Sequence, residues 1–426
     1  MDIQEEQLGV KLGKTAEDEN VSKDKFYFVL ITLFFLGTVS VLPLTFFTTA
    51  NEYWMYKFRN TTFDHDDPNN RTFLQKNFAT LQAFAVLAPM VFVYILSIFV
   101  GHTVKAQTRV IIFLVPVVLV LSFQTVLVKI DTDDYQLTFF LMTSISLVVI
   151  SVAMSIGSVG CITLATCFPT NYVKCFLVSQ GLAGIFTSTI RIMSIISSSS
   201  VIDAGFIYFV VGSTTMGLAC VLFVVASQTA FFRHYMRAAK PQVTKKINSF
   251  KDIFRIFNII YLIIGLNVIL AIFPVLSIAN LVVSEFKDTD NVWGDKYFVT
   301  VATYFIPAVC DIVGRLTSNI FDRDFSIWFL YVLSTVRTAI LSPMLFFSNA
   351  LPRTRTPVIF GNDWEYILIM AATYFTQSYF GNVIMLKMIR SVPKDKLDLT
   401  FSVNMFFTGT ITAVGTLFGI IIVALL

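Results

Sequence analysis

Two residues of opposite charge, Asp311 and Arg315, lie within the apolar stretch 304–321. Their spacing of four puts both side chains on one face of a helix, one turn apart. A carboxylate accepts hydrogen bonds, whereas a guanidinium is a planar fork of donors, so together they offer both kinds of partner to a polar solute. They can also pair with each other and brace the helix against a neighbour. We favour solute binding, because charged residues inside membrane-spanning helices usually serve function.

The composition of the chain predicts a membrane protein built from helices. Of its 426 residues, 56% are hydrophobic and 14% are charged, whereas charged residues make up about 25% of a typical soluble domain. The mean hydropathy is +0.75. The apolar runs reach the roughly 20 residues that a helix needs to cross a bilayer, and they lack the alternating pattern of barrel strands. We therefore predict an all-α polytopic membrane protein.

The apolar runs predict eleven spans with approximate boundaries. A long basic segment, 228–255, separates a bundle of six helices (26–227) from a bundle of five (256–426). Two bundles joined by such a linker are typical of transporters, in which the substrate site lies between the bundles near the middle of the membrane. The predicted spans cover residues 26–50, 79–101, 110–129, 137–166, 176–198, 204–227, 256–280, 298–320, 326–347, 365–387 and 401–425.

Charge and glycosylation signals agree on one orientation of the chain. The segments that this orientation places inside, including the N-terminal tail (1–25) and the basic linker, carry more lysine and arginine than the external segments, as the positive-inside rule requires. Asn60 and Asn70 each begin an Asn-X-Thr sequon in the loop 51–78, which then lies outside. We expect both asparagines to be glycosylated, the N-terminus to be cytosolic and the C-terminus extracellular, and the protein to reside in the plasma membrane.

The sequence gives little support for catalysis or for a resident metal. Its histidines, His65, His102 and His234, are dispersed over loops and span edges, and its 5 cysteines lie in or beside the spans without metal-ligand spacing. A membrane-embedded enzyme needs such residues clustered at active-site spacing. Neither a P-loop for ATP nor a filter segment of a channel is visible. We expect no enzymatic activity and no cofactor, metal or nucleic-acid partner.

Several strings along the chain resemble the equilibrative nucleoside transporter family. The sharpest is Asp-Ile-Val-Gly-Arg at 311–315, which is similar to that family's eighth-span signature. The run Ser-Gln-Gly-Leu-Ala-Gly at 179–184 is similar to its fifth-span signature, and shorter matches occur at 42–43, 273–274 and 406–407. Eleven spans, a glycosylated first external loop and a long loop after span six are also that family's layout. The resemblance extends over nearly the whole chain.

This resemblance implies a major-facilitator-like fold and a facilitative carrier that moves nucleosides by alternating access of its two bundles. At Leu44 the family usually has Trp, and at Ser158 it often has a Gln that contacts the base. Span ten adds a polar patch at 374–379. The candidate substrate-binding residues are Asp311, Arg315, Gln180, Gln377, Leu44, Ser158 and Phe273.

Four further residues are candidates for helix packing or gating. Gly181 and Gly184 on span five and Gly314 on span eight are small enough to let helices approach closely. Arg337 on span nine resembles a family arginine, and we expect it to have a structural or gating role. Its charge inside a span also requires a partner or an interface to which it can snorkel.

Two alternatives to a purely facilitative nucleoside carrier stay open. Asp311 can titrate if it is desolvated, which would allow a proton-coupled carrier of nucleosides or nucleobases. A carrier of organic cations with the same fold is the second alternative, although Arg191, Arg315 and Arg337 bias the spans toward positive charge. We expect neutral nucleosides as substrates and a monomeric carrier embedded in the lipid bilayer.

Overall fold

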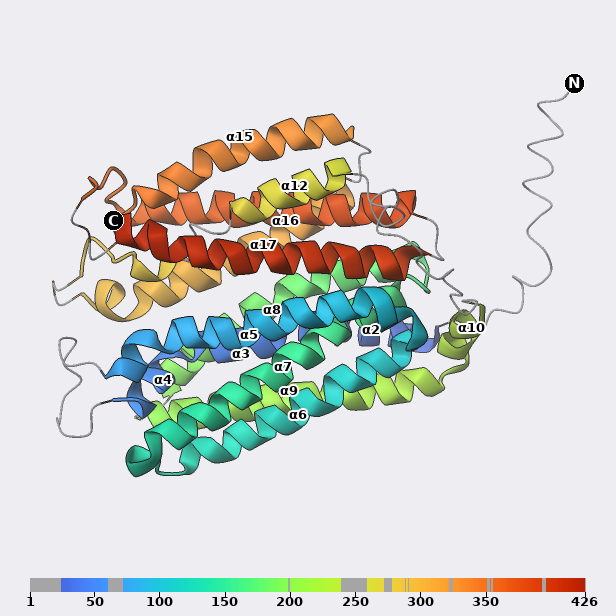
Figure 1. Cartoon of the computed structure of the whole chain (residues 1–426), viewed down its shortest axis with the longest axis horizontal. Helices are drawn as coiled ribbons and strands as arrows, with labels where there is room; N and C mark the ends of the chain where they lie inside the picture. The colour runs from blue at the N-terminus through green and yellow to red at the C-terminus, as the bar shows by residue number, and fades with distance from the viewer. Residues whose placement is uncertain are drawn as a thin grey trace, which may run out of the picture.

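The chain folds into helices that run side by side along the long axis of the molecule (Figure 1). The only bridges between extended residues in the described part of the chain are Val282 with Ala350 and Ser348 with Phe360. The candidates Phe273, Asn60 and Asn70 lie outside the described residues. The computed structural model describes residues 24–59, 72–197, 200–238, 259–271, 278–287, 289, 291–321, 325–350, 353, 355–392 and 396–425.

The helices fall into an N-terminal and a C-terminal group, coloured blue to green and yellow to red in Figure 1. The N-terminal group comprises α2 (Phe28–Val39), α3 (Leu42–Thr49), α4 (Asn51–Lys57), α5 (Phe73–Val100), α6 (Ala106–Lys129), α7 (Gln136–Ala165), α8 (Thr170–Ser197), α9 (Val201–Gln228) and α10 (Ala230–Ala238). The C-terminal group comprises α12 (Ile259–Leu270), the π-helix η8 (Val299–Phe305), α14 (Ile306–Ile320), α15 (Ile327–Phe346), α16 (Asp363–Ser391) and α17 (Leu397–Leu425). Short helical turns are η2 (Lys25–Tyr27), η4 (Gly101–Thr103), η5 (Asp133–Tyr135), η6 (Ala279–Leu281) and η7 (Trp293–Tyr297).

In the described part of the chain, 8 helical segments are long and apolar enough to cross a membrane. The segments Lys25–Val39 and Tyr261–Leu270 are apolar but shorter. Helix α16 has 29 residues but is not among the 8, and its polar side chains between Thr373 and Asn382 lower its hydropathy. The prediction of an all-helical, multi-pass membrane protein is confirmed, while the count of eleven spans stays a prediction.

The first predicted span, 26–50, is divided in the structure. Helix α2 ends at Val39 and α3 begins at Leu42, with Pro43 in its first turn. Proline has no backbone N–H and disfavours the helical conformation in the residue before it, so a helix begins more easily at Pro43 than it passes through. Ser40 satisfies part of the interrupted backbone by donating its hydroxyl to the carbonyl of Gly37 at 2.7 Å.

Two segments expected as loops contain helices. The segment 51–78 includes α4 and the first residues of α5. The basic linker begins with α10, in which Phe231 and Phe232 are buried whereas Arg233 and His234 are exposed. Helix α10 is therefore amphipathic, with its aromatic face against the helices and its basic face outward.

A buried ion pair joins the two groups of helices. Arg109 near the start of α6 donates Nη2 to Asp398 in the first turn of α17 at 2.6 Å, and their side chains are 6% and 3% exposed. Thr163 of α7 donates its hydroxyl to the same carboxylate oxygen at 2.8 Å. Nε and Nη1 of Arg109 have no hydrogen-bond partner among the described residues. Asp398 therefore supplies the compensation for the buried Arg109 charge.

Replacing Asp398 by Asn should lower thermal stability, because an uncompensated buried charge costs about 3–5 kcal/mol. The matched control is Lys129→Gln, which breaks the ion pair between Lys129 and Asp203, whose side chains are 49% and 51% exposed. Exposed pairs contribute little to stability. Size-exclusion chromatography after heating measures both melting midpoints. Equal midpoints for Asp398→Asn and wild type would contradict the role given to the buried pair.

Candidate functional site

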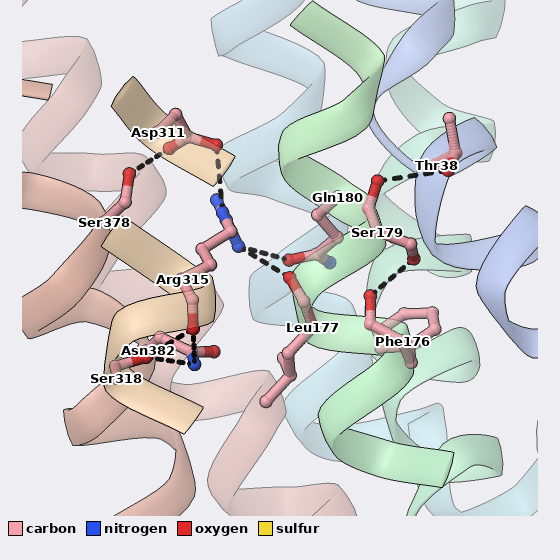
Figure 2. A network of polar contacts seen from close by, with 10 residues as sticks. All are labelled: Thr38, Phe176, Leu177, Ser179, Gln180, Asp311, Arg315, Ser318, Ser378 and Asn382. Carbon is pink, nitrogen blue, oxygen red and sulfur yellow. Dashed lines mark hydrogen bonds and ion pairs between the residues drawn. The ribbon is translucent and has the colours of Figure 1, made fainter. Parts of the chain in front are cut away.

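Asp311 and Arg315 on α14 form an ion pair that reaches across to α8 (Figure 2). Arg315 donates Nε to Oδ2 of Asp311 at 3.0 Å, and it donates Nη1 to the carbonyl of Leu177 at 3.0 Å and to Oε1 of Gln180 at 3.2 Å. Gln180 and Leu177 belong to the N-terminal group, whereas α14 belongs to the C-terminal group. The guanidinium of Arg315 therefore links the two groups of helices.

Helix α16 supplies the second partner of Asp311. Ser378 donates its hydroxyl to Oδ1 of Asp311 (Figure 2). One turn further along α16, Asn382 donates Nδ2 to the hydroxyl of Ser318 at 2.6 Å and to the carbonyl of Arg315 at 3.4 Å. In the sequence, Ser378 was placed within the polar patch 374–379 without a role, and Asn382 was not singled out. Their spacing of four indicates that both lie on one face of a helix, but it does not indicate which helix they contact.

Three glycines lie where the helices of the site approach most closely. A Cβ on Gly181 would lie 2.6 Å from Oδ2 of Asp311, and a Cβ on Gly184 would lie 2.9 Å from Cβ of Ala308. On α14, a Cβ on Gly314 would lie 2.4 Å from the carbonyl oxygen of Phe375. Real Cβ atoms essentially never come this close to other heavy atoms. At Gly184 and Gly314 the obstacle is a neighbouring Cβ or backbone carbonyl, so α14 can pack at these distances from α8 and α16 only where glycine is present. At Gly181 the obstacle is the carboxylate of Asp311, which an added Cβ would displace.

The other sequence-predicted residues lie elsewhere or make different contacts. On α7, Ser158 donates its hydroxyl to the carbonyl of Ser155 at 3.1 Å and lies 3.2 Å from the hydroxyl of Tyr94 on α5. Leu44 on α3 packs against a hydrophobic core that is formed mostly by the N-terminal group and also includes residues of α16 and α17. Gln377 on α16 has a buried Oε1 without a hydrogen-bond partner among the described residues.

Arg337 on α15 bonds to α16. It donates Nε to the hydroxyl of Thr376 at 2.5 Å and Nη2 to the carbonyl of Thr373 at 2.7 Å, and the residue is 6% exposed. The sequence expectation of a structural or gating role is compatible with these contacts, which hold α15 against α16.

The Asp311–Arg315 pair has the chemical capacity to bind a polar solute. The side chains of Arg315 and Asp311 are 23% and 20% exposed, so neither is sealed from a solute. A carboxylate has about four lone-pair sites, and Asp311 uses one on each oxygen for Arg315 and Ser378. The opposite charges compensate each other, which favours a neutral solute with hydroxyl and ring-nitrogen groups over an ion.

The chain has helices of membrane-spanning length, and a partly exposed ion pair lies between them. These features identify an integral membrane protein with a polar site between its helices. A family model described as "Nucleoside transporter" matches residues 144–242 and 236–424. The chain belongs to this nucleoside transporter family.

Relatives cover nearly the whole chain. Equilibrative nucleoside transporter 3 of Rattus norvegicus is 23% identical over 432 residues, which are 95% of this chain and 90% of the relative. Equilibrative nucleoside transporter 1 of Homo sapiens is 22% identical over 453 residues, covering 93% of this chain and 97% of the relative. Among solved structures, the nucleoside transporter NupG matches with a TM-score of 0.47 and 12% identity, covering 92% of this chain and 90% of that chain. A double Trp mutant of XylE matches with a TM-score of 0.48 and 9% identity, covering 93% of this chain and 95% of that chain.

Replacing Gly181 by Ala should reduce nucleoside uptake by about tenfold or more, because the new methyl group displaces the Asp311 carboxylate, and overpacking costs about 1–3 kcal/mol. The matched control is Gly381→Ala on α16, where an added Cβ meets nothing within 4 Å. Uptake of radiolabelled uridine, normalised to the amount at the cell surface, measures the effect. The same uptake from both variants would show that close approach at Gly181 is not required.

Proposed function

We propose that this protein is a facilitative carrier that moves nucleosides down their gradient by alternating access of its two groups of helices. The observation that carries the proposal is the Asp311–Arg315 pair, which is partly exposed and bonded across to α8 at Gln180. A solute held there contacts both groups of helices, as an alternating-access carrier requires. Membership of the nucleoside transporter family and the names of the relatives support nucleosides as the substrate class.

The proposed roles follow from the chemistry of each side chain. Asp311 accepts hydrogen bonds from ribose hydroxyls or a base N–H, and Arg315 donates to ring nitrogens, carbonyls or hydroxyl oxygens. Gln180 has an amide that both donates and accepts, and Gln377 has a buried acceptor oxygen. Leu44, Ser158 and Phe273 complete the proposed set of binding residues given above.

The proposed architecture is eleven spans in bundles of six and five, arranged as in major-facilitator carriers. The order of the helices supports it, because α9 ends at Gln228 and α12 begins at Ile259, on either side of the basic linker. We place the N-terminus and the linker in the cytosol and the C-terminus outside, and we propose a monomeric carrier in the plasma membrane. The distribution of lysine, arginine and sequons supports this orientation.

Conservative changes at the ion pair should abolish uptake without reducing the amount of protein at the surface. Asp311→Asn and Arg315→Lys each keep the size of the side chain but change its hydrogen bonds, and losing such recognition costs about 10²–10⁴-fold in the strongest cases. The measurements are surface biotinylation and uptake of uridine, adenosine, inosine, adenine and a monoamine at two pH values. We expect saturable nucleoside uptake that exceeds monoamine uptake.

The exchanged pair, Asp311→Arg with Arg315→Asp, separates solute recognition from bracing. An ion pair that only holds helices together does so equally well with its two charges exchanged. Full restoration of surface amount and uptake by the exchange would therefore refute the binding role. Uptake that requires an inward proton gradient would favour the proton-coupled alternative, and monoamine uptake above nucleoside uptake would favour the organic-cation alternative.

Replacing both Asn60 and Asn70 by Gln should remove the mass shift that a glycosidase produces on the wild-type protein, because the loop 51–78 is proposed to face the lumen where glycans are added. Electrophoresis with and without glycosidase measures it. The complementary measurement is protease digestion of intact cells, in which the linker 228–255 should be resistant. Cleavage of that linker by protease added outside the cells would contradict the proposed orientation.

A further inference from the structure

Helix α10 begins where a membrane-spanning segment of the N-terminal group ends. The segment Val201–Gln228 stops at Thr229, whose extended backbone (φ −69°, ψ 147°) interrupts the helix. The hydroxyl of Thr229 accepts a hydrogen bond from the backbone N–H of Phe232 at 3.3 Å, so Thr229 caps the helix that follows. Helix α10 is therefore a separate 9-residue helix at one end of the molecule (Figure 1).

Aromatic rings fix α10 at the boundary of the membrane-spanning segments. Phe231 stacks on Phe168 and on Tyr172, with ring centroids 6.2 and 5.7 Å apart. Phe168 lies between the segments Asp133–Ala165 and Thr170–Ser194, both of which are long and apolar enough to cross a membrane. Tyr172 is in the first turn of α8. These contacts hold α10 at the level where the helices leave the hydrocarbon core of a bilayer.

The outer face of α10 is basic. Arg233, His234 and Arg237 are exposed and form this basic face. Arg233 and Arg237 are one turn apart, which places their Cβ atoms about 5–6 Å from each other. A guanidinium is a planar fork of donors that matches the oxygens of a phosphate. Two guanidiniums on one turn of a helix that is held in place are therefore suited to a phosphate group.

Little negative charge lies near the basic face. Asp24 is the one acidic residue among the described residues at this end of the N-terminal group. Its carboxylate accepts hydrogen bonds from the backbone N–H groups of Val29 and Leu30 at 3.1 and 3.2 Å. It also accepts one from the hydroxyl of Tyr172 at 3.0 Å. No salt bridge joins either arginine of α10 to a described residue, so their charges are open to an anion.

Exposed aromatic side chains lie beside the basic face at the start of α2 (Figure 1). Phe26 and Tyr27 are 93% and 68% exposed, and both have a positive φ, of 58° and 54°. This conformation is strained for bulky residues and persists only where other contacts hold it, here the bonds of Asp24 to the first turn of α2. Tyr27 is one turn from Ile31, which is 51% exposed, as expected of a lipid-facing residue. Aromatic side chains at the end of a span typically lie among lipid headgroups.

The sequence after α10 continues its positive charge. Residues 239–255 contain five lysines and arginines but one acid, Asp252. Clusters of about 4–8 basic residues beside a span or on an amphipathic helix are typical of segments that bind anionic headgroups. The basic residues are Lys240, Lys245, Lys246, Lys251 and Arg255.

We propose that the basic face of α10 binds a phospholipid whose headgroup carries phosphomonoester groups, as in phosphorylated inositol lipids. Arg233 and Arg237 donate to one phosphate, which carries about two negative charges and so matches two guanidiniums. The level of α10 favours a lipid over a soluble phosphate, because acyl chains in the bilayer keep the headgroup at this height. Such lipids belong to the cytoplasmic leaflet, which the proposed orientation places on this side. The binding does not depend on which solute the protein transports.

The test is fluorescence anisotropy of dioctanoyl phosphatidylinositol 4,5-bisphosphate, labelled on one acyl chain, with the purified full-length protein in a neutral detergent. This probe should bind at a concentration lower by about tenfold or more than equally labelled dioctanoyl phosphatidylcholine, because charge-assisted hydrogen bonds hold its phosphates. Added salt should weaken the binding, since exposed charges are screened. Equal binding of the two probes would overturn the proposal, because the headgroup would then make no difference.

Replacing both Arg233 and Arg237 by Gln should weaken binding of the bisphosphate probe by about tenfold or more. The matched control is Lys287→Gln with Arg355→Gln, which removes the same charge from two exposed residues at the opposite ends of the spans. The control should bind as wild type does. Equal binding by the two double variants would overturn the proposal, because only the net charge of the protein would then matter.

A milder variant keeps the test independent of folding. Arg233→Lys with Arg237→Lys preserves the charge of α10 but not the forks of donors, and it should weaken binding by about threefold or more. Size-exclusion chromatography shows which variants elute as wild type. Unchanged binding by this variant would contradict the assignment of the two guanidiniums as phosphate ligands.

Two competitors distinguish other partners. Inositol 1,4,5-trisphosphate has similar phosphates without acyl chains, and polyglutamate represents an acidic segment of a protein. Unlabelled dioctanoyl phosphatidylinositol 4,5-bisphosphate should displace the probe at a lower concentration than either. Displacement by the trisphosphate at the same concentration as the lipid would mean that the ligand is a soluble phosphate ester. Displacement by polyglutamate at a lower concentration would mean that the partner is an acidic protein, and either result would overturn the lipid.

Discussion

The packing of the helices in this protein depends on how charged side chains are compensated where water is excluded. Three arginines inside the described helices represent three degrees of compensation. Arg109 is paired with Asp398 and both are buried, so any movement that separates α6 from α17 must break that pair. Arg315 is paired with Asp311 but both remain partly exposed, so a solute can compete for their hydrogen bonds. Arg337 has neutral partners only among the described residues, which leaves its charge the least compensated of the three.

These electrostatic contacts rely on close backbone approach. Arg315 reaches the carbonyl of Leu177 because α14 and α8 touch at Gly181 and Gly184, and Ser378 reaches Asp311 because α16 touches α14 at Gly314. A side chain at any of these positions separates the helices by tenths of an ångström or more, and hydrogen bonds weaken steeply with such displacement. The glycines and the charged pair therefore act as one unit. The glycines allow the short distance between the helices, and the hydrogen bonds of the charged pair require that distance.

The sequence predicted the contacts that helix periodicity governs and missed those that depend on packing between distant helices. The spacing of Asp311 and Arg315 was sufficient to place them one turn apart. The family resemblance added Gln180, which does bond to Arg315. Neither Ser378 nor the pair of Arg109 with Asp398, 289 residues apart, follows from local spacing. Which residues meet across such distances is fixed by the register of whole helices.

In the proposed mechanism, the bonds of Arg315 also connect solute binding to movement of the helices. Its Nη1 donates to two acceptors on α8, so these N–H groups are occupied while α8 and α14 are close. When the two helices move apart, the same donors are free for the oxygen and nitrogen acceptors of a solute. A ligand shifts a conformational equilibrium only by its difference in affinity for the two states. A solute that replaces the α8 acceptors has such a difference, because it gains in the separated state the hydrogen bonds that the protein loses there. In the proposed mechanism, the site that binds the solute is thus also a contact between α8 and α14 that breaks when the helices move apart.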